Sequence, residues 1–159
     1  MPADISPPSL PGAVLFACNF NRVRSPMAEA LLKRLVGTAV FVDSCGLKRA
    51  PPQEEDEEEG PARADPFAEA VMAEFGCDLS SHRTKTFADL DDQSFDLVIS
   101  LTPEAQHRSV ELARGRAADI EYWPTQDPTL VEGSREARLT AYREVRDALA
   151  RRIAERFGR

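Results

Sequence analysis

The sequence has few cysteines, no long apolar run and no excess of basic residues. Its three cysteines, at positions 18, 45 and 77, form no Cys-x-x-Cys pair and leave an odd number, so neither a disulfide framework nor a zinc site is indicated. No apolar stretch approaches the length of a membrane span, and the chain does not open with a basic segment followed by an apolar one. These absences predict a cytoplasmic protein that does not associate with membranes.

Basic residues are outnumbered, since 20 Lys and Arg stand against 27 Asp and Glu, for a net charge of −7. This balance argues against a nucleic-acid partner. It does not argue against an enzyme that acts on phosphate groups, because such an enzyme needs only a local positive pocket. Nothing in the composition indicates a cofactor.

The residues that are present suit one globular domain. A length of 159 residues with 42% hydrophobic residues is enough to bury a sizeable core. Residues 1–12 contain four prolines and a glycine, which predicts a flexible leader before a single domain at 13–159. Consecutive acidic residues at 54–59 dominate the stretch 53–60, and their mutual repulsion predicts a mobile loop there.

Apolar runs alternate with helical patterns along the chain. This alternation predicts an α/β fold in three layers, with a four-stranded parallel sheet and helices on both faces. The predicted strands are 13–17, 39–42, 95–101 and 117–122. The predicted helices begin near Pro26, Asp65, Pro103 and Ser134.

The segment from Cys18 to Pro26 carries the clearest indication of chemistry, because it joins the first predicted strand to the first predicted helix. Such a loop presents unpaired backbone N–H groups and the positive end of a helix dipole, which together bind phosphate. Arg24 can hold two phosphate oxygens, and the same positive surroundings favour Cys18 as a nucleophilic thiolate. The plainer interpretation is a structural cysteine buried at the end of a strand.

The Cys-x5-Arg-Ser-Pro run resembles the signature of the low-molecular-weight protein tyrosine phosphatase family. The likeness covers about residues 13–157, because four further blocks follow in the order and spacing of that family. The blocks are Asp43-Ser44-Cys45-Gly46, Ser81-His82-Arg83, residues 95–101 and Asp127-Pro128. The resemblance implies a sheet with a phosphate-binding loop after the first strand.

It also implies a metal-independent phosphatase that hydrolyses phosphate monoesters, of the protein phosphotyrosine type, through a cysteinyl-phosphate intermediate. Its partner would be a phosphorylated protein or a small phosphomonoester, and a phosphate or sulfate ion would bind in the loop. Cys18 would be the nucleophile, Arg24 would stabilise the phosphate oxygens, and Asp127 would be the general acid.

The resemblance implies roles for neighbouring residues as well. Ser25 would donate a hydrogen bond to the sulfur of Cys18. The residues implied in phosphate binding are Asn19, Phe20, Asn21, Arg22, Val23, Arg24 and Ser25. Those implied in supporting the loop are Asn21, Ser25, Ser44 and His82.

Several positions depart from the pattern of the family, mostly at the rim of the pocket. Phe20 stands where glycine is common, and Arg22 replaces a neutral residue that normally faces the substrate. Thr129 and Leu130 follow the Asp-Pro pair in place of the usual aromatic residues, so a phenyl ring has fewer stacking partners. Trp123 could replace one of those aromatic residues or belong to the core.

Two other functions remain open at this point. Arsenate reduction on the same fold needs two further cysteines close together, whereas Cys45 and Cys77 are 32 residues apart in the sequence. A non-catalytic protein that binds phosphate or a phosphopeptide is the other possibility, but the presence of Cys18, Arg24 and Asp127 together favours turnover.

Overall fold

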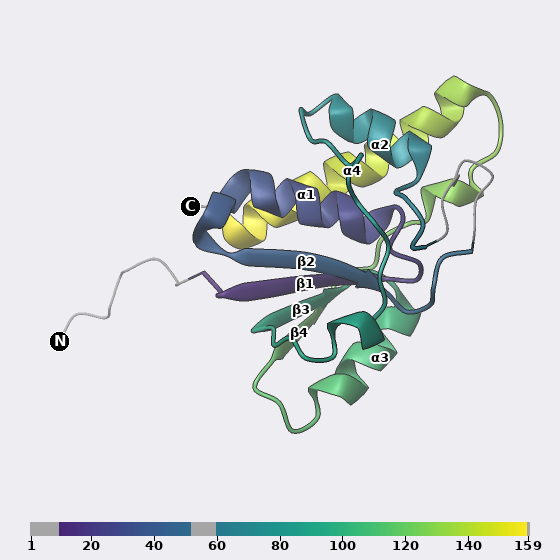
Figure 1. The fold of residues 1–159 in the computed structure, drawn as a ribbon. Helices are drawn as coiled ribbons and strands as arrows, with labels where there is room; N and C mark the ends of the chain where they lie inside the picture. Colours follow the sequence, from purple (N-terminus) through teal and green to yellow (C-terminus); the bar gives the residue numbers. More distant parts are fainter. Residues whose placement is uncertain (1–9, 52–59, 159) are drawn as a thin grey trace.

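The computed structural model describes residues 10–51 and 60–158, and Figure 1 shows how they are arranged. One parallel sheet has the strand order β2-β1-β3-β4. Its strands are β1 (Ala13–Cys18), β2 (Phe41–Gly46), β3 (Leu97–Ser100) and β4 (Asp119–Tyr122). The predicted four-stranded parallel sheet is confirmed. The predicted acidic loop at 53–60 and the predicted leader at 1–12 lie outside the described residues, apart from residues 10–12 and 60.

Helices cover both faces of this sheet, which confirms the predicted three layers. Three helices lie on one face, and α3 lies on the other with the short 3-10 helix η2 (Figure 1). The helices are α1 (Arg24–Val36), α2 (Pro66–Ala73), α3 (Pro103–Ala113) and α4 (Arg135–Phe157), and the 3-10 helices are η1 (Gly37–Ala39), η2 (Ala88–Leu90) and η3 (Pro128–Leu130).

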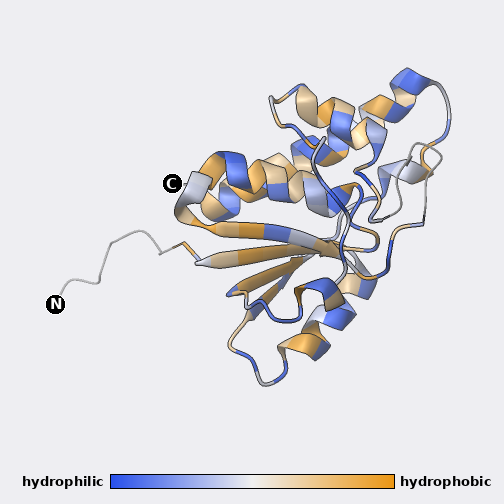
Figure 2. Cartoon of the chain, in the orientation of Figure 1, coloured by the Kyte–Doolittle hydropathy of each residue, from blue (hydrophilic) through white to orange (hydrophobic). Residues whose placement is uncertain are grey.

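The sheet divides the core into two apolar clusters. In Figure 2 the strands are the most apolar elements of the chain. Alternate residues of β1 serve the two faces, as the period of a strand requires. Val14 and Phe16 pack beneath α1 and α4, whereas Leu15 and Ala17 pack beneath α3. Burying a large apolar side chain contributes about 1.5–3 kcal/mol, so this two-sided burial holds β1 firmly in the centre of the sheet.

Several elements begin at other residues than the sequence predicts, and β3 and β4 each begin two residues later than the predicted strands 95–101 and 117–122. β2 begins at Phe41 and continues to Gly46, whereas the apolar run predicted a strand at 39–42. The polar residues Asp43 and Ser44 concealed the second half of this strand, yet its whole length pairs with β1. Helix α1 begins at Arg24 and not at Pro26, because the chain turns into helical geometry before the proline.

The end of β1 lies where the topology reverses. The chain leaves β1 for α1 on one face of the sheet and leaves β3 for α3 on the other face (Figure 1). Sheets of this kind form a crevice beyond the carboxyl ends of two such neighbouring strands. The loop of residues 19–23 lies at this position, directly after Cys18.

Candidate active site

The loop of residues 19–23 turns its carbonyl groups outwards. The carbonyl oxygens of Cys18, Asn19 and Arg22 accept hydrogen bonds from backbone N–H groups at 2.9–3.0 Å. The donors are Leu47, Lys48 and Asp65. In contrast, the N–H groups of residues 19–23 donate to no acceptor within residues 10–51 and 60–158. Five neighbouring donors are therefore free to bind an anion.

The first turn of α1 is equally open. Its N-cap residue, Val23, makes no side-chain capping bond, and the turn contains no acidic residue. The other three α-helices are capped by side-chain oxygens, those of Asp65, Thr102 and Ser134. The positive end of the α1 dipole is thus uncompensated where the loop ends, which adds to the attraction for an anion.

The sulfur of Cys18 lies against this group of donors. It is 2.9 Å from the hydroxyl oxygen of Ser25, which in turn accepts a 2.8 Å hydrogen bond from Nδ2 of Asn21. Because Nδ2 of Asn21 can only donate, the Ser25 hydroxyl hydrogen is left for a different acceptor. The sulfur of Cys18 and, at 3.3 Å, the carbonyl oxygen of Cys45 are those acceptors, and the sulfur is closer. The arrangement suits a Cys18 thiolate.

Asn21 is the central support of the loop. It is fully buried with a φ of 60°, a left-handed conformation that Asn tolerates better than most residues. Its Nδ2 also donates to the hydroxyl of Ser44 at 2.9 Å, and its Oδ1 accepts from the N–H of Lys85 at 3.1 Å. Its carbonyl oxygen lies 2.8 Å from Nε2 of His82. Every polar atom of the side chain therefore resists relaxation of the backbone.

The network continues behind the loop to Glu29, which accepts a 2.5 Å hydrogen bond from the Ser44 hydroxyl. Burial lowers the pKa of His82, against the opposing effects of the Asn21 carbonyl and Glu29. A neutral His82 ring donates from Nε2 to that carbonyl. Hydrogen bonds thus run outwards from Asn21 in two directions, towards Glu29 and towards Cys18.

Gly46 allows the loop to lie against the end of β2. A Cβ atom at this position would come within 2.7 Å of the carbonyl carbon of Phe20 and 2.9 Å of the amide nitrogen of Asn21. Only glycine leaves room for such backbone contact. The neighbouring Cys45 is fully buried on the α3 side of the sheet, and burial, followed by the charge of Cys18, raises the pKa of its thiol.

Arg24 and Asp127 face each other beside the loop. Nη1 of Arg24 donates a 3.0 Å hydrogen bond to the carbonyl oxygen of Thr125, and its Nη2 lies 3.9 Å from Oδ2 of Asp127. The N–H and the hydroxyl of Thr129 hold the other carboxylate oxygen at 3.0 and 2.6 Å. Oδ2 of Asp127 is thus the oxygen on the side of the loop.

The rim residues lie in different surroundings. Phe20 is exposed by 42% and Leu130 by 77%, so both offer apolar surface. Nε of Arg22 donates to the carbonyl oxygen of Arg63 at 3.0 Å. Trp123 is only 3% exposed and packs against Phe16 and Phe157, which makes it a core residue and not a replacement for a rim aromatic.

Sequence reasoning gave no role at the loop to Gly46, Glu29, Thr102 or Thr125. The role of Gly46 could have been inferred from its place at the end of the block Asp43-Ser44-Cys45-Gly46, because a glycine permits close backbone contact. The hydroxyl of Thr102 donates to Oδ1 of Asn19 at 2.7 Å while it caps α3. Thr125 acts through its backbone carbonyl oxygen. Every residue type has this group, so the sequence does not single out Thr125.

Within residues 10–51 and 60–158, no three His, Cys, Asp or Glu side chains come together as a metal site would need. None of the helices in this part of the chain is long and apolar enough to cross a membrane.

The known proteins that resemble this chain share one fold family. The model of the low molecular weight phosphotyrosine protein phosphatases matches residues 13–157. An arsenate reductase of Halalkalibacterium halodurans is 31% identical over 140 residues, covering 88% of this chain and 91% of the relative. A probable low molecular weight protein-tyrosine-phosphatase, EpsP of Ralstonia solanacearum, is 30% identical over 122 residues, covering 72% and 77%.

Solved structures agree on the fold. A mutant of YwlE from Bacillus subtilis has a TM-score of 0.69 at 24% identity and covers 92% of this chain and 99% of that one. An arsenate reductase in the oxidised state has a TM-score of 0.66 at 28% identity, with coverage of 91% and 95%. With nearly the whole chain matched by one family model, the chain belongs to the low molecular weight phosphotyrosine protein phosphatase family and is an enzyme of the phosphatase class.

Proposed function

We propose that the chain hydrolyses phosphate monoesters, with protein phosphotyrosine as the substrate class, through a cysteinyl-phosphate intermediate. The observation that carries this proposal is the loop of residues 19–23, whose N–H groups have no acceptor in the described chain and which begins at the sulfur of Cys18. A phosphate group bound there by three of its oxygens presents its phosphorus to that sulfur.

The first step transfers the phosphoryl group to the enzyme. The thiolate of Cys18 attacks phosphorus while the bond between phosphorus and the ester oxygen breaks. Asp127, in its protonated form, gives its proton to that leaving oxygen. Arg24 and the loop amides stabilise the charge on the oxygens that stay with phosphorus.

The second step releases phosphate. Water attacks phosphorus and loses a proton to the carboxylate of Asp127, and the bond between sulfur and phosphorus breaks. The hydroxyl of Ser25, at 2.9 Å from the sulfur, stabilises the departing thiolate. The enzyme then returns to its starting protonation state, so one water is consumed for each phosphate released.

Reduction of arsenate is the second candidate, because arsenate reductases are among the similar proteins. Arsenate resembles phosphate and suits the same loop, but its reduction needs an electron pair from further thiols. Cys45 packs in the cluster beneath α3, whereas Cys77 packs in the cluster beneath α1 and α4. This separation by the sheet argues against their acting as a pair and favours phosphate ester hydrolysis.

One experiment tests the proposal and its alternatives. Wild type should hydrolyse an aryl phosphate, Cys18→Ser should not, and acid quenching should trap phosphate on the protein only when Cys18 is present. Phosphate binding by wild type without any turnover would instead support a non-catalytic protein. Arsenate-dependent consumption of a thiol reductant, in the absence of phosphatase activity, would support the reductase.

A further inference from the structure

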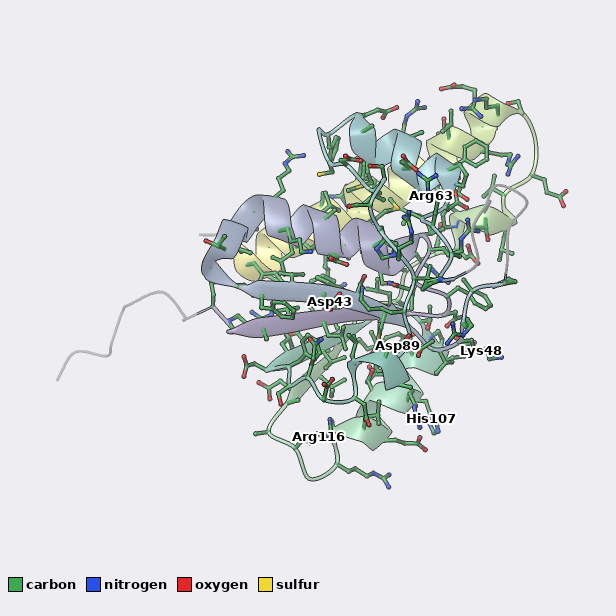
Figure 3. All side chains as sticks on the ribbon, in the orientation of Figure 1. Asp43, Lys48, Arg63, Asp89, His107 and Arg116 are labelled. Carbon is green, nitrogen blue, oxygen red and sulfur yellow. The ribbon has the colours of Figure 1, made fainter. Side chains whose placement is uncertain are left out.

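Basic side chains gather around the loop in a chain that is acidic overall. Four of them form what is here called the basic rim: Arg22, Lys48, Arg49 and Arg63. Lys48, Arg49 and Arg63 are exposed, and Arg22 is half-buried. Figure 3 labels Lys48 and Arg63 on the side of the molecule where the strands end. The rim is defined without residues 52–59, which lie outside the described part of the chain.

Hydrogen bonds to backbone carbonyl oxygens connect three residues of the basic rim to the loop or to one another. The N–H of Lys48 donates to the carbonyl oxygen of Asn19 at 2.9 Å, so Lys48 follows directly beside the first part of the loop. Nε of Arg22 donates to the carbonyl oxygen of Arg63 at 3.0 Å, which places Arg63 beside its last part. Basic residues are therefore attached to the anion-binding loop on two sides, through the backbone of Lys48 and of Arg63.

These cations lack acidic partners in the described chain. Most arginines elsewhere in the helices form ion pairs or lie over aromatic rings, such as Arg143 with Glu74 and Arg138 over Phe67. None of the four rim residues forms an ion pair within residues 10–51 and 60–158.

The carboxylates near the loop are already occupied. Asp65 caps α2 and accepts a 3.0 Å hydrogen bond from the hydroxyl of Tyr142. Asp43 pairs with Lys85 at 3.0 Å, and Asp127 is held by Thr129. The positive charge of the rim is therefore available to a ligand, and an anion beside a bound phosphate would meet it.

From this arrangement we infer that the basic rim selects phosphorylated segments in which acidic residues flank the phosphorylated side chain. The inference rests on the proposed phosphatase function and names the substrate class of that same site. The loop binds the phosphate, and the rim binds the neighbouring carboxylates of an acidic peptide. A single exposed ion pair contributes little, so the selectivity comes from several pairs acting together.

The test compares three phosphotyrosine peptides of equal length, flanked by Glu and Asp, by Ala and Gln, or by Lys. The measured quantity is the ratio of kcat/KM for the acidic peptide to that for the neutral peptide. Wild type should give a ratio of about ten at low ionic strength, falling towards one in about 0.5 M salt. The Lys peptide should be the poorest substrate.

Variants show which residues cause the preference for the acidic peptide. Lys48→Gln combined with Arg49→Gln, and separately Arg63→Gln, should reduce the ratio to about two, since each removes part of the charge. The ratio compares two substrates of one enzyme, so any general loss of activity cancels. Arg114→Gln combined with Arg116→Gln is the matched control. These exposed arginines lie beyond the far end of α3, where Figure 3 labels Arg116, and they should leave the ratio unchanged.

A ratio of one in wild type, or an equal fall in the control variant, would overturn the inference. If wild type hydrolyses none of the peptides, the proposed phosphatase function fails. The binding of the peptides to the Cys18→Ser variant then tests the role of the basic rim separately. The inference is supported if Cys18→Ser binds the acidic peptide with a smaller dissociation constant than the neutral peptide and if the rim substitutions remove this difference. Equal dissociation constants overturn it.

Discussion

Asn21 stands at the centre of the loop, and its side-chain amide directs the hydrogen bonds around it. Its two N–H groups go to the hydroxyls of Ser25 and Ser44, so neither hydroxyl can donate back to it. Ser44 therefore donates to Glu29, and the hydroxyl hydrogen of Ser25 is directed to the sulfur of Cys18. One buried amide thus orients a hydrogen bond that a nucleophilic sulfur requires.

The first prediction at this scale concerns the three thiols. Iodoacetate should alkylate Cys18 first, because the hydroxyl of Ser25 lies 2.9 Å from its sulfur and suits a thiolate, which reacts faster than a thiol. Accessibility alone would favour Cys77, which is 9% exposed against 3% for Cys18, whereas Cys45 is fully buried. Peptide mapping by mass spectrometry identifies the modified residue. Inorganic phosphate should protect Cys18, and earlier modification of Cys77 would contradict the thiolate.

The second prediction concerns the general acid. Asp127→Asn should lower kcat by about 10²–10⁴ for an alkyl phosphate with a poor leaving group, and by less for p-nitrophenyl phosphate. The reason is that p-nitrophenolate leaves without protonation. Thr129→Val is a useful companion, because it removes one hydrogen bond to Asp127 but keeps the carboxyl group. An equal loss for both substrates in Asp127→Asn would remove Asp127 from the proton transfer.

The third prediction concerns Gly46. Its replacement by Ala should push the backbone at Phe20 and Asn21 away from β2, because the added carbon would lie within 3.0 Å of both. Phosphate affinity, measured by calorimetry, should fall together with kcat/KM. Gly115→Ala controls for a general loss of stability, because its φ of 78° adds backbone strain while nothing lies within 4 Å of its Cβ position. Unchanged phosphate affinity in Gly46→Ala would mean that the loop tolerates the displacement.

At the scale of the elements, α2 and α4 are joined by an ionic cluster around Glu74. Arg146 is almost fully buried, and its Nη1 donates to the carbonyl oxygen of Val71 and to Glu74, both at 2.7 Å. Arg143 adds hydrogen bonds of 2.9 and 3.1 Å to the same carboxylate. The cluster fixes the C-terminal end of α2 on α4, while the segment before its N-terminal end bonds to the loop at Arg22.

This cluster predicts a pH-dependent stability. Hydrogen bonds from Arg143 and then Arg146 lower the pKa of Glu74 to about 2. A lowered folded-state pKa gives stability that is present above the unfolded value of 4.5 and is lost as the pH falls towards about 2. Glu74→Gln should therefore lower the urea midpoint at pH 7, and the difference from wild type should narrow below about pH 4.5.

The control for this prediction is Glu155→Gln on α4, because Glu155 is exposed and forms no ion pair in the described part of the chain. Because the Glu74 carboxylate is open to solvent, its effect should also decrease in high salt. A difference between Glu74→Gln and wild type that stays constant from pH 7 to pH 3 would contradict the assigned pKa.

The elements also mark how far the sequence could be interpreted alone. Apolar periodicity located all four strands, because their buried residues alternate or run together. It failed at the end of β2, where Asp43, Ser44 and Gly46 serve the loop and not the core. The family resemblance singled out Ser44 and His82, which the structure places on Asn21. The contact of Arg24 with the Thr125 carbonyl depends on the path of the backbone, and no side-chain pattern encodes it.

At the scale of the whole molecule, the chain carries a net negative charge although its site needs an anion. The net charge of −7 includes six consecutive acidic residues at 54–59, which lie outside the described residues. Their charge opposes the approach of a small anion over a distance set by the ionic strength. Replacing them with Gln and Asn should therefore lower KM for an aryl phosphate at low salt while leaving kcat almost unaltered.

The salt dependence separates this charge effect from others. In about 0.5 M salt the difference in KM should nearly disappear, because screening then acts within a few ångströms. Replacing six exposed acidic residues elsewhere controls for the number of charges removed, namely Asp91, Asp92, Glu104, Glu132, Glu144 and Glu155. Equal KM values for wild type and the 54–59 variant at low salt would leave that run with a role in solubility only.

The beginning of β1 and the end of α4 lie on the same side of the molecule, opposite the loop that follows Cys18 (Figure 1). This placement matters for handling the protein as a reagent. A tag, a fusion partner or a surface linker attached through Leu10 or beyond Phe157 would be separated from the loop by the length of the sheet. An immobilised enzyme of this design should keep its activity on phosphorylated substrates in solution, whether it is attached before β1 or after α4.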